Sequence, residues 1–344
     1  MSLIVDIKKD LGGFKLNVQF ETAEGTMGIL GPSGSGKSMT LKCIAGIERP
    51  DQGHIELNGV TLFDSRRRID LKPQQRQVGY LFQNYALFPN MTVERNILCG
   101  LNREKDKAKR REICRRYIAL MGLEGLERRY PAQLSGGQQQ RTALARILAG
   151  APRLIMLDEP FAALDSHLRD RLLMEMKGIL SGFDGTAIAV THNRDEAYDL
   201  CNTLAVMDDG SILAHKETKQ LFRDPGSVPA AIITGCKNIA LAQKTGEHSV
   251  FVPEWGITLT TPKTVSDGVK AVGIRAHHFT GTIENAYPIQ VLGVAEGPFE
   301  DTVRFRYVGQ SPDSPDLWQR LPKQLRTHTA QSIDVVGEDV LVLE

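Results

Sequence analysis

Residues 31–38 constrain the fold of this chain more than any other stretch. They match the pattern Gly-x-x-x-x-Gly-Lys-Ser of a phosphate-binding P-loop, being Gly31, Pro32, Ser33, Gly34, Ser35, Gly36, Lys37 and Ser38. Glycines let the backbone turn so that successive N–H groups face a phosphate. Lys37 can reach the β- and γ-phosphates of a nucleotide, and the Ser38 hydroxyl can ligate Mg²⁺. The alternative is a Gly/Ser-rich turn that matches the pattern by chance.

Candidate strands and helices alternate around this loop. Residues 26–30 predict a strand and residues 39–45 a helix, so a bound phosphate would lie at a helix N-terminus. Residues 154–157 form an apolar run typical of a buried parallel strand, and residues 186–190 predict another. This alternation predicts an α/β fold with a parallel sheet, into which a mainly helical subdomain is inserted at about 84–150.

Length and composition limit the class of protein. The 344 residues suffice for about two domains, and 41% hydrophobic and 24% charged residues are typical of a soluble globular protein. A net charge of +1 provides no basic footprint for nucleic acid. The five cysteines are scattered, which favours a reducing compartment. The sequence shows no signal peptide and no apolar run of about 18 residues, so we expect any membrane connection to go through a partner.

The composition changes near residue 225. We expect three parts: an ATP-binding domain at 1–225, which contains the P-loop, a linker at 226–235 and a small all-β domain at 236–344. The expected strands of the last domain are short and suggest a small barrel; they cover residues 249–252, 257–260, 271–274 and 303–307.

Two carboxylates follow the apolar run at 154–157. Open α/β sheets place their ligands at the carboxyl ends of strands, where Asp158 can hold Mg²⁺ and Glu159 can polarise an attacking water. Adjacent carboxylates are otherwise common at helix starts.

A second glycine-rich sequence, Leu134-Ser135-Gly136-Gly137-Gln138, precedes a predicted helix. Ser-x-x-Gln is a capping box, in which Ser135 caps the helix and Gln138 folds back. The glycines beside the cap also expose the helix N-terminus, which favours a second anion site.

Together with the P-loop, this pentapeptide resembles the signature of the ATP-binding cassette (ABC) superfamily, a branch of the P-loop NTPases. The resemblance covers residues 1 to about 225, with the other motifs in the expected order. Gln83 occupies the Q-loop position, residues 154–159 the Walker B strand, Asp165 the D-loop and His192 the switch position. Without the resemblance, His192 would be interpreted as a polar residue at a strand end.

The resemblance implies a homodimer, in which each ATP lies between the P-loop of one copy and the signature of the other. Ser135 and Gly137 then contact the γ-phosphate across the interface, and Asp165 links the two sites. Glu159 positions the hydrolytic water, while His192 contacts the γ-phosphate. These groups act by positioning and charge stabilisation.

Further residues acquire roles by the same resemblance. Gln83 senses Mg²⁺ and transmits the closing of the ATP site to a membrane partner. Tyr85, Leu87 and Phe88 line the groove that receives a coupling helix of the membrane subunit, although part of this set also suits the core. Phe14 is the candidate for stacking on adenine, or else belongs to the buried face of a strand.

A single cassette followed by a small β domain resembles bacterial import ATPases, whose added domain is of the TOBE (transport-associated OB) kind. Residues 70–83 are most similar to molybdate or tungstate importers, then to sulfate/thiosulfate, sugar, iron or polyamine importers. The implied partners are two transmembrane permease subunits and, indirectly, an extracytoplasmic solute-binding protein, with this chain peripheral at the cytoplasmic face of the membrane. Arg275, His277 and His278 either bind a regulatory oxyanion or are surface residues.

Two other classes remain alternatives. ABC ATPases that act on nucleic acid or ribosomes typically carry long coiled-coil insertions or two cassettes, and this chain shows neither. A stand-alone P-loop enzyme such as a nucleotide kinase needs neither the signature nor Gln83.

Overall fold

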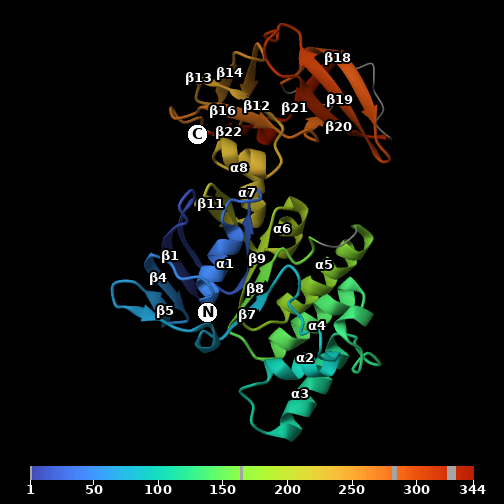
Figure 1. Ribbon diagram of the computed structural model, residues 1–344. Coiled ribbons are helices and arrows are strands. Elements are labelled where there is room, and N and C mark those ends of the chain that lie inside the picture. Colours follow the sequence, from blue (N-terminus) through green and yellow to red (C-terminus); the bar gives the residue numbers. More distant parts are fainter. Residues whose placement is uncertain (1, 163–165, 281–284, 324–330) are drawn as a thin grey trace. The chain divides into compact units, whose positions relative to one another are not determined.

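The computed structural model describes residues 2–162, 166–280, 285–323 and 331–344 of the chain. Its backbone divides into two compact units, Met1–Thr218 and Lys219–Glu344 (Figure 1). Each unit is described by itself below.

The first unit is built on one eleven-stranded sheet with the order β6-β5-β4-β1-β2-β11-β10-β3-β9-β8-β7. Its parallel part comprises β10 (Thr203–Asp208), β3 (Gly25–Leu30), β9 (Thr186–Thr191), β8 (Leu154–Asp158) and β7 (Val78–Leu81). The remaining strands are joined mainly by antiparallel pairs and are β1 (Leu3–Asp10), β2 (Lys15–Thr22), β4 (Gln52–Leu57), β5 (Val60–Asp64), β6 (Ile69–Asp70) and β11 (Ser211–Glu217).

The sheet is therefore mixed, whereas the strand–helix alternation predicted a parallel one. Between β4 and β5 the chain turns at Asn58 and Gly59, whose φ angles are 53° and 77°. Such a two-residue turn with positive φ angles joins antiparallel neighbours, so the chain returns beside itself without a crossover helix. The α/β class of the fold is confirmed, and only one end of the sheet follows the parallel pattern.

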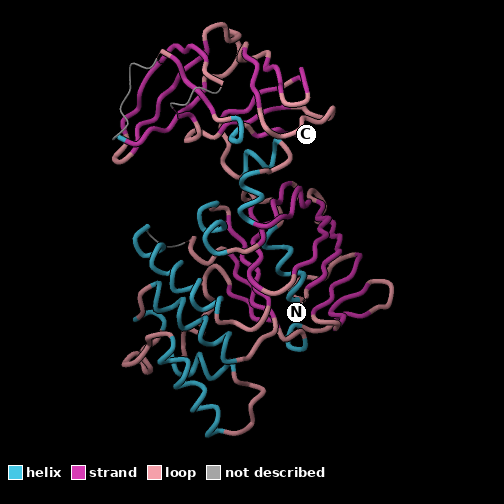
Figure 2. The backbone as a smooth tube through the Cα atoms, turned by 180° about the vertical axis from the view of Figure 1, so that it is seen from behind, coloured by secondary structure: helices cyan, strands magenta, loops and turns pink. Residues whose placement is uncertain are grey.

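Helices cover the sheet and extend beyond β7. They are α1 (Lys37–Ala45), α2 (Val93–Gly100), α3 (Lys107–Leu120), α4 (Gly136–Ala149), α5 (Ser166–Ser181) and α6 (Arg194–Leu200). Short 3-10 turns occur at Pro73–Gln75 and Pro131–Gln133. Figure 2 shows α2 to α5 gathered at the parallel end of the sheet, away from the antiparallel strands. None of the helices in the described ranges has both the length and the apolar character needed to cross a bilayer.

The alternation of side chains along β8 divides the first unit into two hydrophobic cores. Ile155 and Leu157 pack in the core that includes α2, α4 and α5, whereas Leu154 and Met156 face the core that includes α1. Because strand side chains alternate, Asp158 at the end of β8 falls on the side of α1. This register brings the end of the strand to the helix that follows the P-loop.

In its described residues, the second unit consists mainly of β-strands, with helices at its start and a 3-10 turn at Gly337–Asp339. Three sheets have the orders β12-β16-β22, β13-β14-β15 and β17-β21-β18-β19-β20. Their strands are β12 (Asn238–Leu241), β13 (Gln243–Gly246), β14 (Ser249–Val252), β15 (Ile257–Thr260), β16 (Ala271–Ile274), β17 (Phe279–Thr280), β18 (Tyr287–Glu296), β19 (Glu300–Tyr307), β20 (Leu317–Pro322), β21 (Ser332–Val335) and β22 (Leu341–Leu343). All three sheets contribute to one core around Trp255 and Phe305, so the expected all-β character is confirmed.

The segment 226–235, expected to be a linker, is instead an ordered part of the second unit. Helix α7 (Thr218–Arg223) precedes it, and the segment itself contains α8 (Val228–Ile233). Pro229 lies in the first turn of α8, where a missing N–H costs nothing, and Ala230 and Ala231 are fully buried. The Pro/Gly-rich composition thus marks a helix start.

Arg76 is the buried cation that holds α1 in place. Its guanidinium donates to the carbonyl oxygens of Cys43 (2.9 Å) and Ile44 (2.8 Å) at the end of α1, to that of Leu71 (2.7 Å) and to Asp70 Oδ1 (2.9 Å). Burial lowers the pKa of Arg76, and the charge of Asp70 opposes this shift. The side chain therefore adds donors to carbonyl groups at the helix end, where Cys43 also accepts from the Gly46 N–H at 3.2 Å.

We predict that Arg76→Met destabilises the chain by about 3 kcal/mol, because the buried carbonyls lose their donors. Arg49→Met is the matched control, since Arg49 is largely exposed and pairs with the same Asp70 at 3.6 Å. It should cost less than about 0.5 kcal/mol in urea unfolding followed by circular dichroism. Equal losses for the two variants would contradict the role of Arg76.

Candidate functional site

The P-loop connects β3 to α1, and its glycines have the backbone geometry that the pattern predicts. Gly36 has a φ of 102° and is the N-cap of α1. A Cβ added at Gly36 would lie 2.7 Å from Leu16 Cδ1 and 3.1 Å from Phe14 Cζ. Only glycine fits this position, and the half-buried ring of Phe14 borders the loop.

Polar groups converge within the loop. Lys37 is 4% exposed, and its Nζ donates to the carbonyl oxygens of Gly31 (2.9 Å) and Pro32 (2.7 Å). Burial lowers the pKa of Lys37, while the charges of Glu159 and Asp158 raise it. The buried Ser35 Oγ has no hydrogen-bond partner among the described residues. A buried ammonium and an unpartnered hydroxyl beside a helix N-terminus fit the oxygens of a phosphate.

Asp158 is held from two sides. The Ser38 hydroxyl in α1 donates to its Oδ1 at 2.7 Å, and the Tyr80 hydroxyl in β7 donates to its Oδ2, also at 2.7 Å. Within the described ranges, no group of three or more His, Cys, Asp or Glu side chains could hold a metal ion. Asp158 and Ser38 nevertheless fit Mg²⁺, which usually takes one or two carboxylates and completes its shell with phosphate oxygens and waters.

Glu159 and His192 come from the ends of neighbouring strands, β8 and β9. His192 Nδ1 lies 3.2 Å from Glu159 Oε1, and Glu159 has a φ of 46°, in the left-handed region. The Thr191 hydroxyl donates to the buried Glu196 at 2.6 Å and accepts from the Asn193 N–H at 3.0 Å, which fixes the backbone on both sides of His192. The structure thus brings together a carboxylate and an imidazole next to the P-loop strand.

The signature begins α4 as the capping-box interpretation predicts. Ser135 Oγ accepts from the Gln138 N–H at 3.3 Å, and Gln138 Oε1 accepts from the Ser135 N–H at 2.9 Å. Ser135 is exposed, Gly136 and Gln138 are half-buried and Gly137 is buried. No hydrogen bond or ion pair between described residues joins this sequence to the P-loop.

Two other expected residues are not placed in the site. The Gln83 side chain is exposed, and no hydrogen bond in the described part of the chain joins it to Ser38 or Asp158. Asp165 lies outside the described residues.

Sequence reasoning missed two residues that hold the site together. One is Tyr80 of β7, whose place on the face of Asp158 depends on the register between β7 and β8. The other is Arg146 of α4, whose guanidinium donates to the carbonyl oxygens of Ala86 (2.8 Å) and Tyr85 (3.0 Å). Tyr85 and Ala86 have φ angles of 59° and 42°, so Arg146 holds a strained loop just after Gln83. No local pattern indicates such a long-range contact.

Arg275 is buried and not a surface residue. Its guanidinium is buried and donates to the carbonyl oxygens of Thr234 and Phe222, each at 2.6 Å. His278 lies 3.2 Å from Asp339 Oδ1. Burial lowers the pKa of His278, an effect that Asp339 opposes. Arg275 therefore anchors α7 and α8 to the β-strands of the second unit.

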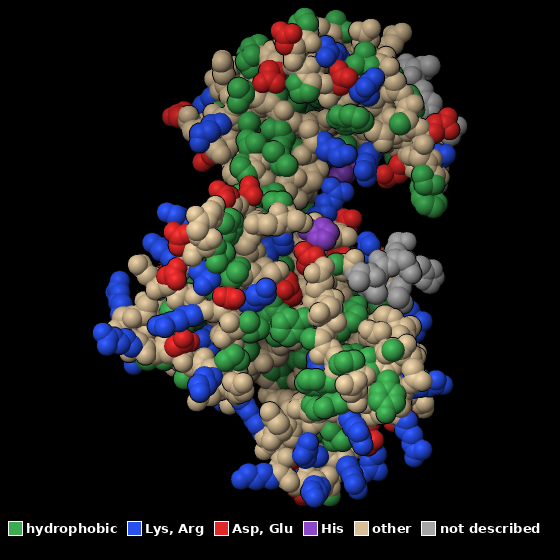
Figure 3. Space-filling view, viewed as in Figure 1, with side chains coloured by type: hydrophobic (Ala, Val, Ile, Leu, Met, Phe, Trp, Pro, Cys, Tyr) green, Lys and Arg blue, Asp and Glu red, His purple; other side chains and the backbone are tan. Residues whose placement is uncertain are grey.

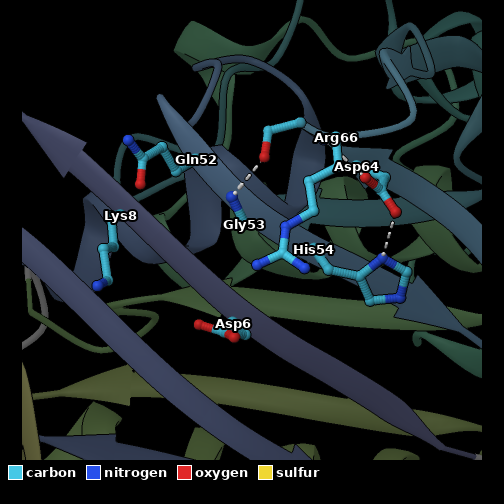
Figure 4. A pocket seen from close by; sticks show the side chains of 8 residues that line it. Asp6, Lys8, Gln52, Gly53, His54, Asp64 and Arg66 are labelled. Carbon is cyan, nitrogen blue, oxygen red and sulfur yellow. Dashed lines mark hydrogen bonds and ion pairs between the residues drawn. The ribbon is translucent and has the colours of Figure 1, made fainter.

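A separate hollow lies on the antiparallel strands β1, β4 and β5 (Figure 4). It is lined by Asp6, Lys8, Gln52, Gly53, His54, Asp64, Ser65 and Arg66. His54 lies between Asp64 (3.4 Å) and Glu56 (3.3 Å), and the Gly53 N–H donates to Ser65 Oγ. Its charges are of both signs, and none of its residues belongs to the P-loop or to the strand ends that carry Asp158 and His192.

Comparisons with known proteins agree with this geometry. Residues 15–162 match the ABC transporter family. Over 227 residues the chain is 38% identical to the molybdenum import ATP-binding protein ModC of Paramagnetospirillum magneticum, covering 66% of this chain and 62% of that protein. It is 43% identical over 224 residues to the sulfate/thiosulfate import ATP-binding protein CysA 2 of Chromobacterium violaceum, covering 65% and 60%. The chain thus spans somewhat less than two thirds of the length of these two relatives.

A longer match is to the molybdate/tungstate import ATP-binding protein WtpC of Thermococcus kodakarensis, 40% identical over 279 residues, with 80% of this chain and 82% of that protein covered. Among solved structures, a dimeric ATP-binding cassette, MJ0796, bound to ADP and Pi has a TM-score of 0.54 and 27% identity, covering 63% of this chain and 99% of that chain. The chain therefore belongs to the ABC transporter family, and its first unit folds as an ATP-binding cassette.

Proposed function

We propose that the chain is the ATP-hydrolysing subunit that energises an ABC importer for an oxyanion. The observation that carries this proposal is the meeting of Glu159 and His192, 3.2 Å apart, at the strand edge where Ser38 contacts Asp158. Phosphoryl transfer to water requires three groups that meet at this edge: a general base, an imidazole that faces the phosphate and a carboxylate that binds the metal ion.

Nucleotide binding rests on the P-loop. Its N–H groups and Lys37 bind the phosphates, which replace the carbonyl oxygens of Gly31 and Pro32 as partners of the ammonium. Phe14 borders the loop and stacks on the adenine. Ser38 and Asp158, together with Gln83 by the family resemblance, would hold Mg²⁺. The cation, when bound, neutralises charge on the phosphate oxygens.

Hydrolysis depends on the pair at the strand edge. Glu159 orients the attacking water and accepts its proton, and His192 donates toward the γ-phosphate. The short contact between the two side chains limits the positions that either can take. This pairing supports the roles that the family resemblance implies.

A second copy of the chain completes each site. Among the described residues, no hydrogen bond or ion pair joins Ser135 or Gly137 to the P-loop of the same chain, yet the helix N-terminus at the exposed Ser135 suits the γ-phosphate. Asp165 then links the two sites. A similar solved cassette, MJ0796, is described as dimeric, which supports this arrangement.

The membrane partners are two permease subunits, which receive the solute from a solute-binding protein outside the cytoplasm. This chain is peripheral on the cytoplasmic face of the membrane. Phe88 is 46% exposed, and Arg146 packs 5.4 Å from the centre of its ring. With the half-buried Leu87, it offers an apolar surface to a coupling helix. In Figure 3, Lys and Arg side chains gather at the bottom of the view, over α3, a helix rich in basic residues.

The names of similar proteins indicate that the transported solute is an oxyanion. The relatives at 38–43% identity are named as importers of molybdenum, molybdate/tungstate or sulfate/thiosulfate. We propose molybdate or tungstate as the cargo and sulfate or thiosulfate as the alternative. The second unit serves as a TOBE-like regulatory module, but Arg275 is engaged by carbonyl groups and is not proposed as an oxyanion ligand.

We predict that Glu159→Gln lowers the rate of ATP hydrolysis at least about 100-fold, because the amide cannot accept the proton of the water. ATP affinity should be retained, and ATP should trap a closed dimer detectable by size-exclusion chromatography. Glu48→Gln, a partly exposed carboxylate on the same unit, is the control. Turnover near the wild-type rate in Glu159→Gln would remove its role as the base.

The cargo class is tested with the chain reconstituted with permease subunits and binding protein. Molybdate or tungstate should stimulate ATP hydrolysis severalfold, because cargo delivery favours the closed dimer. Stimulation by sulfate or thiosulfate alone would support the alternative cargo. Stimulation only by sugars, iron or polyamines would contradict the assignment to oxyanions.

A further inference from the structure

We propose that Tyr80 is the positioning residue for the carboxylate of Asp158, and through it for the Mg²⁺ site. This inference rests on the proposed function and extends it to a residue outside the family motifs. Tyr80 lies in β7, opposite Met156 of β8. Asp158 is two residues further along β8 and therefore on the same face as Met156. The length of a tyrosine side chain spans this diagonal, and the hydroxyl donates to Asp158 Oδ2 at 2.7 Å.

The two carboxylate oxygens have different partners. Among the described residues, Ser38 is the donor to Oδ1 and Tyr80 is the donor to Oδ2. The terminal torsion of an aspartate is broad, so a contact at one oxygen leaves the carboxylate plane free to turn. Contacts at both oxygens fix the plane. Tyr80 therefore fixes the orientation of the Asp158 carboxylate plane relative to the P-loop.

The hydroxyl and the ring of Tyr80 have separate surroundings. The half-buried ring packs against the core that includes α1, and its centre lies 4.4 Å from that of Phe82, the residue before Gln83. The hydroxyl reaches Asp158, which is 7% exposed. In such a site a hydrogen bond to a charged acceptor is stronger than in water. Removing the hydroxyl alone therefore tests the positioning role while the ring packing stays.

The test uses Tyr80→Phe in the full chain, with Tyr117→Phe as the matched control. Tyr117 is half-buried in α3 and packs against the other core of the same unit. Mn²⁺ binding is measured by electron paramagnetic resonance in the presence of a non-hydrolysable ATP analogue. ATP affinity is measured separately in EDTA. The Mn²⁺ affinity of Tyr80→Phe should fall about 10-fold, the usual effect of removing a partner of a metal ligand.

If Tyr80 positions the metal site, three further results are expected. ATP affinity in EDTA must be unchanged in Tyr80→Phe, high Mg²⁺ must restore most of its hydrolysis rate, and Tyr117→Phe must behave as the wild type. Unchanged Mn²⁺ affinity, or an equal loss of ATP affinity without metal, would overturn the assignment. A wild-type chain that retains neither ATP nor Mn²⁺ would instead contradict the proposed function, so the two failures are distinguishable.

Discussion

The carboxylate of Asp158 is the point on which the candidate site depends. Its two hydrogen bonds join α1, β8 and β7, three elements that are far apart in the sequence. Each element is positioned independently: Arg76 holds the end of α1, and the parallel register aligns Tyr80 with the end of β8. Because charged hydrogen bonds in a buried site are strong and directional, small displacements of any element would misplace the carboxylate.

The same sheet edge is consistent with the proposal that a second copy completes each site. Ser38 of α1 contacts Asp158, and Glu159 contacts His192, at the ends of β8 and β9. In the part of the chain that the structure describes, no hydrogen bond or ion pair joins them to the helix N-terminus at Ser135, which also suits an anion. Arg146 connects that helix to the strained loop at Tyr85 and Ala86, which follows Gln83. Helix α4 thus carries the signature at its N-terminal end. Near its other end, Arg146 binds the loop that we propose meets the membrane subunits.

Local chemistry made much of this predictable from sequence. The P-loop at 31–38, the capping box at Ser135 and the strand ending at Asp158 each follow from short-range patterns, and the structure has all three. The expectation of a parallel sheet was wrong because the local Asn58–Gly59 turn pairs β4 with β5 antiparallel. The expectation of a linker at 226–235 was wrong because Ala230 and Ala231 are buried in a helix there. Tyr80 and Arg275 act through contacts that depend on strand register and packing, which no single segment encodes.

We propose that each ATP site is shared between two copies of the chain. Lys37→Ala disables the P-loop, and Ser135→Arg disables the signature, so each variant alone should hydrolyse almost no ATP. In a mixed dimer both defects fall in one site and the other site is intact. Mixing the two inactive variants should therefore restore hydrolysis, to about a quarter of the wild-type rate if the copies pair at random and the sites act independently. Activity no greater than the sum of the separate variants would contradict the shared site.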